Sequence, residues 1–306
     1  STQKHGAEPR ENIWKLAFGD RIYSLLVEMD LLWRLKGGAE IPENEGRKLG
    51  EALEKYQSDI VDCVIAFPWY SSTHTHFRRL LNQQGCRYVS MPMMTQSVME
   101  GPMLASWEDV AARTDRVYDV LREAATLHLK TPDGTDLEFG VGPLDLIHKD
   151  SGDFSKPGAF GNLPAGESYL VPESGSVNGN MVLTSGPDRP NIGPTCAIVR
   201  NSRIKGFQEM TEYAEELEAK FNRDFEMRNI AELGIGTNPL AKDVSSMIEG
   251  EKICGTVHVA IGSDKWIGGE VEASEHLDHV LLSPTLTATM KSGAQVMIVD
   301  EGQLQL

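Results

Sequence analysis

The chain has 306 residues, enough for two domains or for one large α/β unit with a substantial core. Its 29 lysines and arginines are outnumbered by 45 aspartates and glutamates, which gives a formal net charge of −16. This balance excludes nucleic acids and anionic membranes as expected partners, because both require a basic face. Four scattered cysteines, no apolar run of about 20 residues and a polar start without a leader-like apolar core predict a cytoplasmic protein.

Residues 1–128 are expected to form an α/β domain with a parallel sheet. Apolar residues spaced three and four apart indicate helices, and short Val- and Ile-rich runs that stop at a proline indicate buried parallel strands. Ser106 and Asp109 form a capping pattern at the start of one helix. Helices are predicted over 12–36, 43–56, 69–85 and 106–127, and strands over 59–67 and 86–92.

Residues 129–306 are expected to form a second domain, of the α+β class and rich in strands. The TPDGT turn at 131–135 lies between two strand-like runs and predicts a β-hairpin. Short strands and Gly/Pro turns then continue to the end, and one helix is predicted over 207–221. The change of pattern predicts a domain boundary near residue 128.

Glu232 is the first candidate metal ligand. It lies in IAELGIGTNP, where an apolar strand ends in a glycine-rich turn. Burying its carboxylate beside Ile230 and Leu233 would be costly unless it were paired or bound to a metal ion. An outward-facing glutamate on an edge strand is the alternative. Glu167, in LPAGESYLVP, lies in a similar setting, although a glutamate after a turn is common.

Two imidazoles and an aspartate complete the candidate set. His258 is flanked by apolar residues in GTVHVAIG and is either a ligand or a hydrogen-bonded core residue. His276 and Asp278 in EHLDHV project from the same face of a strand, and His279 points the other way. Together with the two glutamates they predict a centre for one or two divalent ions: zinc, cobalt, manganese or ferrous iron.

His74 and His76 form a separate pair in SSTHTHFRR, after the first predicted strand. Ligand sites of α/β sheets gather at this end of the strands, which favours substrate contact. On a helix the two side chains would diverge by about 200°, so they would not share one ion. A plain polar helix start is the alternative. The glycine-rich segments lack the context of a dinucleotide site, and no nucleophile elbow or Walker loop is present.

Several of these segments resemble the aminopeptidase T family of metallopeptidases. The matching segments are STHT at 72–75, SMP at 90–92, GNLPAGE at 161–167, NIAELGIGTNP at 229–239, EKICGTVHVAIG at 251–262 and the run ending in HLD at 268–278. The resemblance implies an α/β domain followed by a β-rich metal-binding domain, and an intracellular homodimer. The metal ligands that it implies are Glu167, Glu232, His258, His276 and Asp278.

The resemblance implies a metal-dependent hydrolase of the aminopeptidase or amidase type. Metal-activated water would cleave a C–N bond in a peptide or small-molecule substrate, with Glu167 or Glu232 as the proton acceptor and His74 contacting the substrate. Two departures from the family are visible: the chain is shorter, and Lys265 stands where those peptidases have a tyrosine seven residues past the histidine of GTVH. We expect Lys265 to stabilise the oxyanion instead.

Two alternatives remain open. The chain is also similar to 2,5-dihydroxypyridine 5,6-dioxygenase, which uses one ferrous iron, and His74, His76 and Trp69 would then line an aromatic pocket. That enzyme has a histidine in place of the ELG glutamate and lacks equivalents of Glu167 and His258, so the complete donor set favours the hydrolase. The other alternative is a non-catalytic relative that binds a metal or a small ligand.

Overall fold

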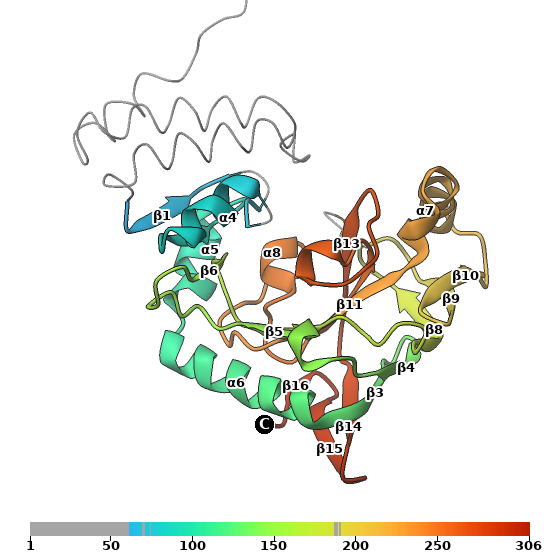
Figure 1. Ribbon diagram of the computed structural model, residues 1–306. Helices are drawn as coiled ribbons and strands as arrows, with labels where there is room; N and C mark the ends of the chain where they lie inside the picture. Colours follow the sequence, from blue (N-terminus) through green and yellow to red (C-terminus); the bar gives the residue numbers. More distant parts are fainter. Residues whose placement is uncertain (1–60, 69–70, 74, 187–188, 190) are drawn as a thin grey trace, which may run out of the picture. The chain divides into compact units, whose positions relative to one another are not determined.

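The computed structural model describes residues 61–68, 71–73, 75–186, 189 and 191–306, and these form two compact units (Figure 1). The first unit contains the described residues up to Ser90 together with Phe154–Phe160, and the second contains Met91–Asp153 and Gly161–Leu306. The helices expected over 12–36 and 43–56 lie outside the described residues. The domain boundary near residue 128 stays a prediction. Residue 128 itself lies within a strand, at 124–130.

The first unit contains the small parallel sheet. Strands β1 (Cys63–Ala66) and β2 (Arg87–Ser90) pair in parallel, and helix α4 (His76–Gln83) connects them. Next to β2 in the sheet is β6 (Phe160–Asn162), of which Phe160 belongs to this unit. The helix begins after Thr75, whose side chain accepts a hydrogen bond from the Arg78 backbone N–H. The predicted strand–helix–strand order is confirmed. The core of the unit is formed by residues of α4, of β2 and of the turn between them: Phe77, Leu81, Cys86 and Tyr88.

The second unit is built mainly from two antiparallel sheets. The larger has the strand order β10-β9-β8-β4-β3-β14-β15-β16. Its strands are β3 (Ala124–Lys130), β4 (Asp136–Gly140), β8 (Asn178–Leu183), β9 (Thr195–Arg200), β10 (Arg203–Phe207), β14 (Thr285–Met290), β15 (Gln295–Asp300) and β16 (Gln303–Leu304). The hairpin predicted at 131–135 is confirmed as the turn between β3 and β4.

The smaller antiparallel sheet has the order β13-β12-β11-β7-β5. Its strands are β5 (Ile147–Asp150), β7 (Glu167–Leu170), β11 (Ile230–Gly236), β12 (Val257–Gly262) and β13 (His276–Leu281). Every residue of β11 and β12 is buried, so both faces of these central strands are covered. Leu233 and Val259 belong to the hydrophobic core that this sheet shares with the larger one.

Helices cover the second unit and connect its strands. The α-helices are α5 (Gln96–Glu100), α6 (Trp107–Glu123), α7 (Glu212–Arg223) and α8 (Met247–Gly250), and the 3-10 helices are η2 (Pro102–Leu104), η3 (Leu144–Leu146), η4 (Phe225–Arg228) and η5 (Lys265–Ile267). Helix α6 is capped by Ser106, as predicted, and packs against β5, β7 and β14. The helix predicted over 207–221 starts too early, because Phe207 pairs in β10 and Thr211 caps α7.

The predicted fold class is confirmed in its mixed α/β content and its one small parallel sheet, while most of the strands are antiparallel. Among the described residues, no helix is long and apolar enough to span a membrane. The four cysteines form no disulfide.

Candidate metal centre

One face of the smaller sheet carries a row of polar side chains. Side chains alternate between the two faces of a strand, so residues that are paired across strands share a face. Glu232 on β11 pairs with Ala260 on β12, and Ala260 pairs with Asp278 on β13. The same register places His276 and His258 on this face, two residues away along their strands. The opposite face of β11 packs into the core through Leu233 and Ile235.

Glycine makes room for the imidazole of His258. Gly234 pairs directly with His258 in the antiparallel register. A Cβ built on Gly234 would lie 2.1 Å from both Cε1 and Nε2 of that ring, closer than any real contact. Gly234 therefore serves the site, because only a residue without a side chain lets the ring lie over the neighbouring strand.

Five donors form two groups of three that share Glu232. Glu167, Glu232 and His258 form one group and Glu232, His276 and Asp278 the other, and the ligand atoms of each group lie within 4.8 Å of one another. Glu232 links the groups, since its Oε1 lies 3.2 Å from Nε2 of His258 and its Oε2 lies 3.4 Å from Nε2 of His276. Nε2 of His276 is also 3.3 Å from Oδ1 of Asp278. The structure therefore brings together all five donors that the sequence singles out.

The ring of His276 is oriented by a backbone group outside the donor set. Its Nδ1 lies 2.6 Å from the carbonyl oxygen of Ser263. A carbonyl oxygen only accepts, so Nδ1 carries the proton and Nε2 is left to face Glu232 and Asp278. Metal-binding histidines are commonly held in this way, by a second hydrogen bond that fixes tautomer and ring orientation.

The electrostatics of the cluster favour a cation among these donors. Burial acts to raise the pKa of Glu232, but hydrogen bonds from His258 and His276 outweigh it and lower this pKa to about 2. Burial acts to lower the pKa of His258, but the hydrogen bond to Glu232 and the nearby carboxylates raise it to about 9. The Glu232 carboxylate thus stays ionised and stabilises positive charge beside it. A divalent ion can replace the imidazole protons in that role, since metal binding displaces them.

Two buried polar atoms of the cluster have no hydrogen-bond partner. They are Oε2 of Glu167 and Nδ1 of His258. A buried oxygen of this kind normally finds a partner, because leaving it unpaired costs about 1–3 kcal/mol. Oxygen and nitrogen donors with spare lone pairs, gathered on a rigid sheet, are the chemistry that a divalent metal ion requires. The residues present therefore fit a metal ion.

Several residues beside the donors were not anticipated from the sequence. Lys252 is buried and places its Nζ 2.7 Å from Oε1 of Glu167 and 2.9 Å from Oε2 of Glu251. Burial raises the pKa of Asp150 to about 7 and that of Glu251 to about 7. Tyr169 shares a row with Gly234 and His258. In the sequence, Lys252 is marked only by its place in the segment EKICGTVHVAIG, close to His258. A lysine is normally expected to be exposed, so its burial could not be anticipated.

Other predicted residues do not join this cluster. Lys265 lies in the exposed turn η5, and no hydrogen bond or ion pair of the described residues links it to the donors. His74 and Trp69 lie outside the described residues, and His76 is the first residue of α4. His279 points away from the donors, as predicted, and its Nε2 lies 2.8 Å from the Tyr213 hydroxyl.

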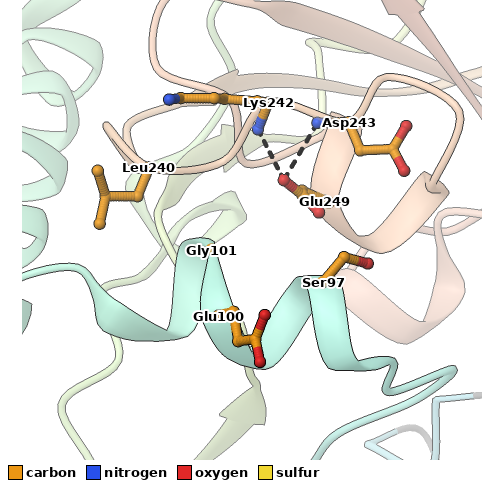
Figure 2. Close-up of a pocket in the computed structure, with 7 residues that line it drawn as sticks. All are labelled: Ser97, Glu100, Gly101, Leu240, Lys242, Asp243 and Glu249. Carbon is orange, nitrogen blue, oxygen red and sulfur yellow. Dashed lines mark hydrogen bonds between the residues drawn. The ribbon is translucent and has the colours of Figure 1, made fainter.

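A separate surface cavity of about 450 Å³ lies between α5 and the 240–249 segment (Figure 2). Its lining residues are Ser97, Glu100, Gly101, Leu240, Lys242, Asp243 and Glu249. Glu249 points into this region, but its Oε1 accepts hydrogen bonds from the backbone N–H groups of Lys242 and Asp243 (Figure 2). That carboxylate therefore holds the turn, and we assign no chemistry to the cavity.

The fold is similar to two solved structures of enzymes. The structure of 2,5-dihydroxypyridine dioxygenase from Pseudomonas putida KT2440 matches with a TM-score of 0.71 and 20% sequence identity, over 87% of this chain and 76% of that chain. Wild-type AmpT from Thermus thermophilus matches with a TM-score of 0.59 and 14% identity, over 90% of this chain and 85% of that chain. At these identities the likeness shows a shared fold alone. No curated protein matches the sequence.

The family profile decides between the two enzyme classes that the sequence suggests. The profile described as 2,5-dihydroxypyridine 5,6-dioxygenase matches residues 44–305. The prediction of an aminopeptidase or amidase is therefore wrong, and the oxyanion role of Lys265 is withdrawn with it. The donor set misled because imidazoles and carboxylates bind metal in hydrolases and in oxygenases alike. The resemblance to aminopeptidase T holds for the fold. The chain belongs to the 2,5-dihydroxypyridine 5,6-dioxygenase family.

Proposed function

We propose that this protein is a metal-dependent dioxygenase that opens the ring of a hydroxylated pyridine or a closely related hydroxylated aromatic compound. The observation that carries the proposal is the triad of Glu232, His276 and Asp278, with the His276 ring oriented by the Ser263 carbonyl. Membership of the dioxygenase family supports the reaction class. The substrate is then a small molecule.

Glu232, His276 and Asp278 would hold the metal ion, and ferrous iron is the ion that we propose. Non-haem iron oxygenases commonly use two histidines and one carboxylate, whereas this triad has one histidine and two carboxylates. Oxygen donors remain suitable for ferrous iron, so the set fits. When bound, the iron would supply dioxygen activation and a position for a hydroxyl group of the substrate.

The two sides of the donor set differ in access. The side chains of His276 and Asp278 are 29% and 16% exposed, whereas that of His258 is 1% exposed. The donors of β13 are therefore the more accessible ones. His258 is buried and, through its hydrogen bond to Oε1, fixes the orientation of the Glu232 carboxylate.

Tyr169 is the residue that we propose for contact with the substrate. It is partly exposed on the polar face, in the row of Gly234 and His258. Its ring lies 5.2 Å from that of His148, and His148 is held by a 2.8 Å hydrogen bond from its Nε2 to the Ile267 carbonyl oxygen. A flat ring and a hydroxyl on a fixed support suit a flat, hydroxylated substrate.

Oxygen consumption tests this proposal. Protein purified without oxygen and loaded with ferrous iron should consume one O₂ per molecule of 2,5-dihydroxypyridine. The product mass should exceed that of the substrate by two oxygen atoms. His276→Ala should abolish turnover and lower the iron content, while His128→Ala, on the exposed surface of the other sheet, should change neither. Absence of oxygen uptake with every hydroxylated pyridine tested, in fully iron-loaded protein, would refute the proposed function.

A further inference from the structure

Glu167 differs from the other carboxylates of the cluster in its partners. Oε1 of Glu167 forms an ion pair of 2.7 Å with Nζ of Lys252. Oε2 lies 3.6 Å from Nε2 of His258 and has no hydrogen-bond partner, although it is buried. The two oxygens are therefore not equivalent: one is fixed by a cation, and the other faces the donor set with its lone pairs free.

Lys252 is itself held firmly. Its side chain is only 1% exposed, and its Nζ lies 2.9 Å from Oε2 of Glu251. Lys252 also belongs to the short loop after α8. The backbone of this loop is tied to the segment that follows β11, since the Asn238 N–H donates to the Lys252 carbonyl oxygen over 2.8 Å. A buried ammonium with two carboxylate partners and a fixed backbone has few alternative positions. Because Lys252 is fixed, its ion pair with Oε1 also fixes the orientation of the Glu167 carboxylate.

A fixed ammonium does two things for a carboxylate. It selects which oxygen is free, and it lowers the cost of keeping a second negative charge beside Glu232 in a buried site. Carboxylate ligands of metal ions are commonly hydrogen-bonded by outer groups in this way, and loss of such a group typically lowers metal affinity by about 10–100-fold.

We propose that Lys252 is a positioning residue of the metal centre: it holds Oε1 of Glu167 so that Oε2 is presented to the donor set beside His258 and Glu232. Lys252 touches neither metal nor substrate and acts through Glu167. The inference rests on the metal centre of the proposed function. It adds Glu167 to the triad of that centre as a further carboxylate, with Lys252 as the group that fixes its orientation.

Metal affinity tests the inference without reference to turnover. The probe is Mn²⁺, with the free ion measured by electron paramagnetic resonance during titration of the 306-residue chain. Lys252→Met should raise the dissociation constant by about 10–100-fold. Lys149→Met is the matched control, because it removes a lysine of β5 that pairs with Asp115 at the surface, and it should leave the affinity unchanged.

A double-mutant cycle separates positioning from general damage. Glu167→Gln alone should weaken Mn²⁺ binding about as much as Lys252→Met, and the double variant should be no worse than either, because both changes remove one interaction. Unchanged affinity in Glu167→Gln would overturn the inference even if Lys252→Met did not fold. Full additivity would overturn it as well. If the Mn²⁺ affinities change as expected but the protein consumes no oxygen, the result would contradict the proposed dioxygenase function and not the role of Lys252.

Discussion

Replacing Gly234 by alanine gives a sharp test of how the site is built. The new Cβ would lie 2.1 Å from Cε1 and Nε2 of His258, well inside van der Waals contact. Both β11 and β12 are buried along their length, so the backbone has little freedom to move aside. The imidazole must therefore swing away, and its 3.2 Å hydrogen bond to Glu232 breaks.

The expected cost has two parts. Overpacking a buried position costs about 1–3 kcal/mol. Leaving the buried Glu232 carboxylate without one of its partners costs about 1–3 kcal/mol more. Gly234→Ala should therefore lower the free energy of unfolding by about 2–6 kcal/mol, from the sum of these two ranges. Alanine is otherwise acceptable in a strand, so the effect comes from His258 rather than from backbone preference.

Urea denaturation of the metal-free protein, followed by fluorescence, measures this difference. Gly206→Ala is the matched control, because Gly206 also lies in a strand and a Cβ there would meet no atom within 4 Å. Adding Gly234→Ala to His258→Ala should cost little, since the ring that it strikes is already absent. If Gly234→Ala and Gly206→Ala proved equally stable, the tight approach of His258 to β11 would be refuted.

Three further outcomes follow from the same geometry. Tyr169→Phe should raise KM for the hydroxylated substrate several-fold with a smaller change in kcat, as steady-state kinetics would show; an unchanged KM would remove Tyr169 from the substrate site. Burial lowers the pKa of His279 to about 4, below its unfolded value of about 6.5, so stability should fall as the pH drops from 6.5 towards 4, by up to about 3 kcal/mol. Denaturation at several pH values should show this loss in the wild type and less of it in His279→Gln; an equal loss in both would contradict it. Metal removal by a chelator should lower Tm, and Mn²⁺ at 100 times its dissociation constant should restore about 2.7 kcal/mol of stability; a Tm that did not respond to the metal would argue against a site on the folded state.

Four of the five donors could be found in the sequence because each reflects a local rule, whereas the setting of Glu167 is a common one. Glu232 and His258 interrupt apolar strand patterns, and a buried ionisable group in such a run needs a partner. The two-residue spacing of His276 and Asp278 places both on one face, and their side chains do meet, with Nε2 and Oδ1 3.3 Å apart. Burial and strand periodicity act on neighbouring residues, so the sequence alone displays them.

The rest of the site depends on strand register and could not be read from the sequence. Lys252 meets Glu167 across 85 residues of chain, through a loop whose direction no local pattern sets. Tyr169 joins the site only because β7 pairs with β11 at Gly234. The reaction class was also out of reach, because the donor atoms define which ions bind and not which bond is then broken.

The position of β13 at the edge of its sheet has a consequence for motion. His276 and Asp278 lie on this edge strand, whereas Glu232 and His258 lie on the interior strands β11 and β12. Edge strands have pairing partners on one side only and open at lower free energy than interior ones. A metal ion shared by Glu232, His276 and Asp278 would therefore fasten the edge to the interior. Amide hydrogens of β13 should then exchange more slowly in the metal-loaded protein, while those of β11 should barely change.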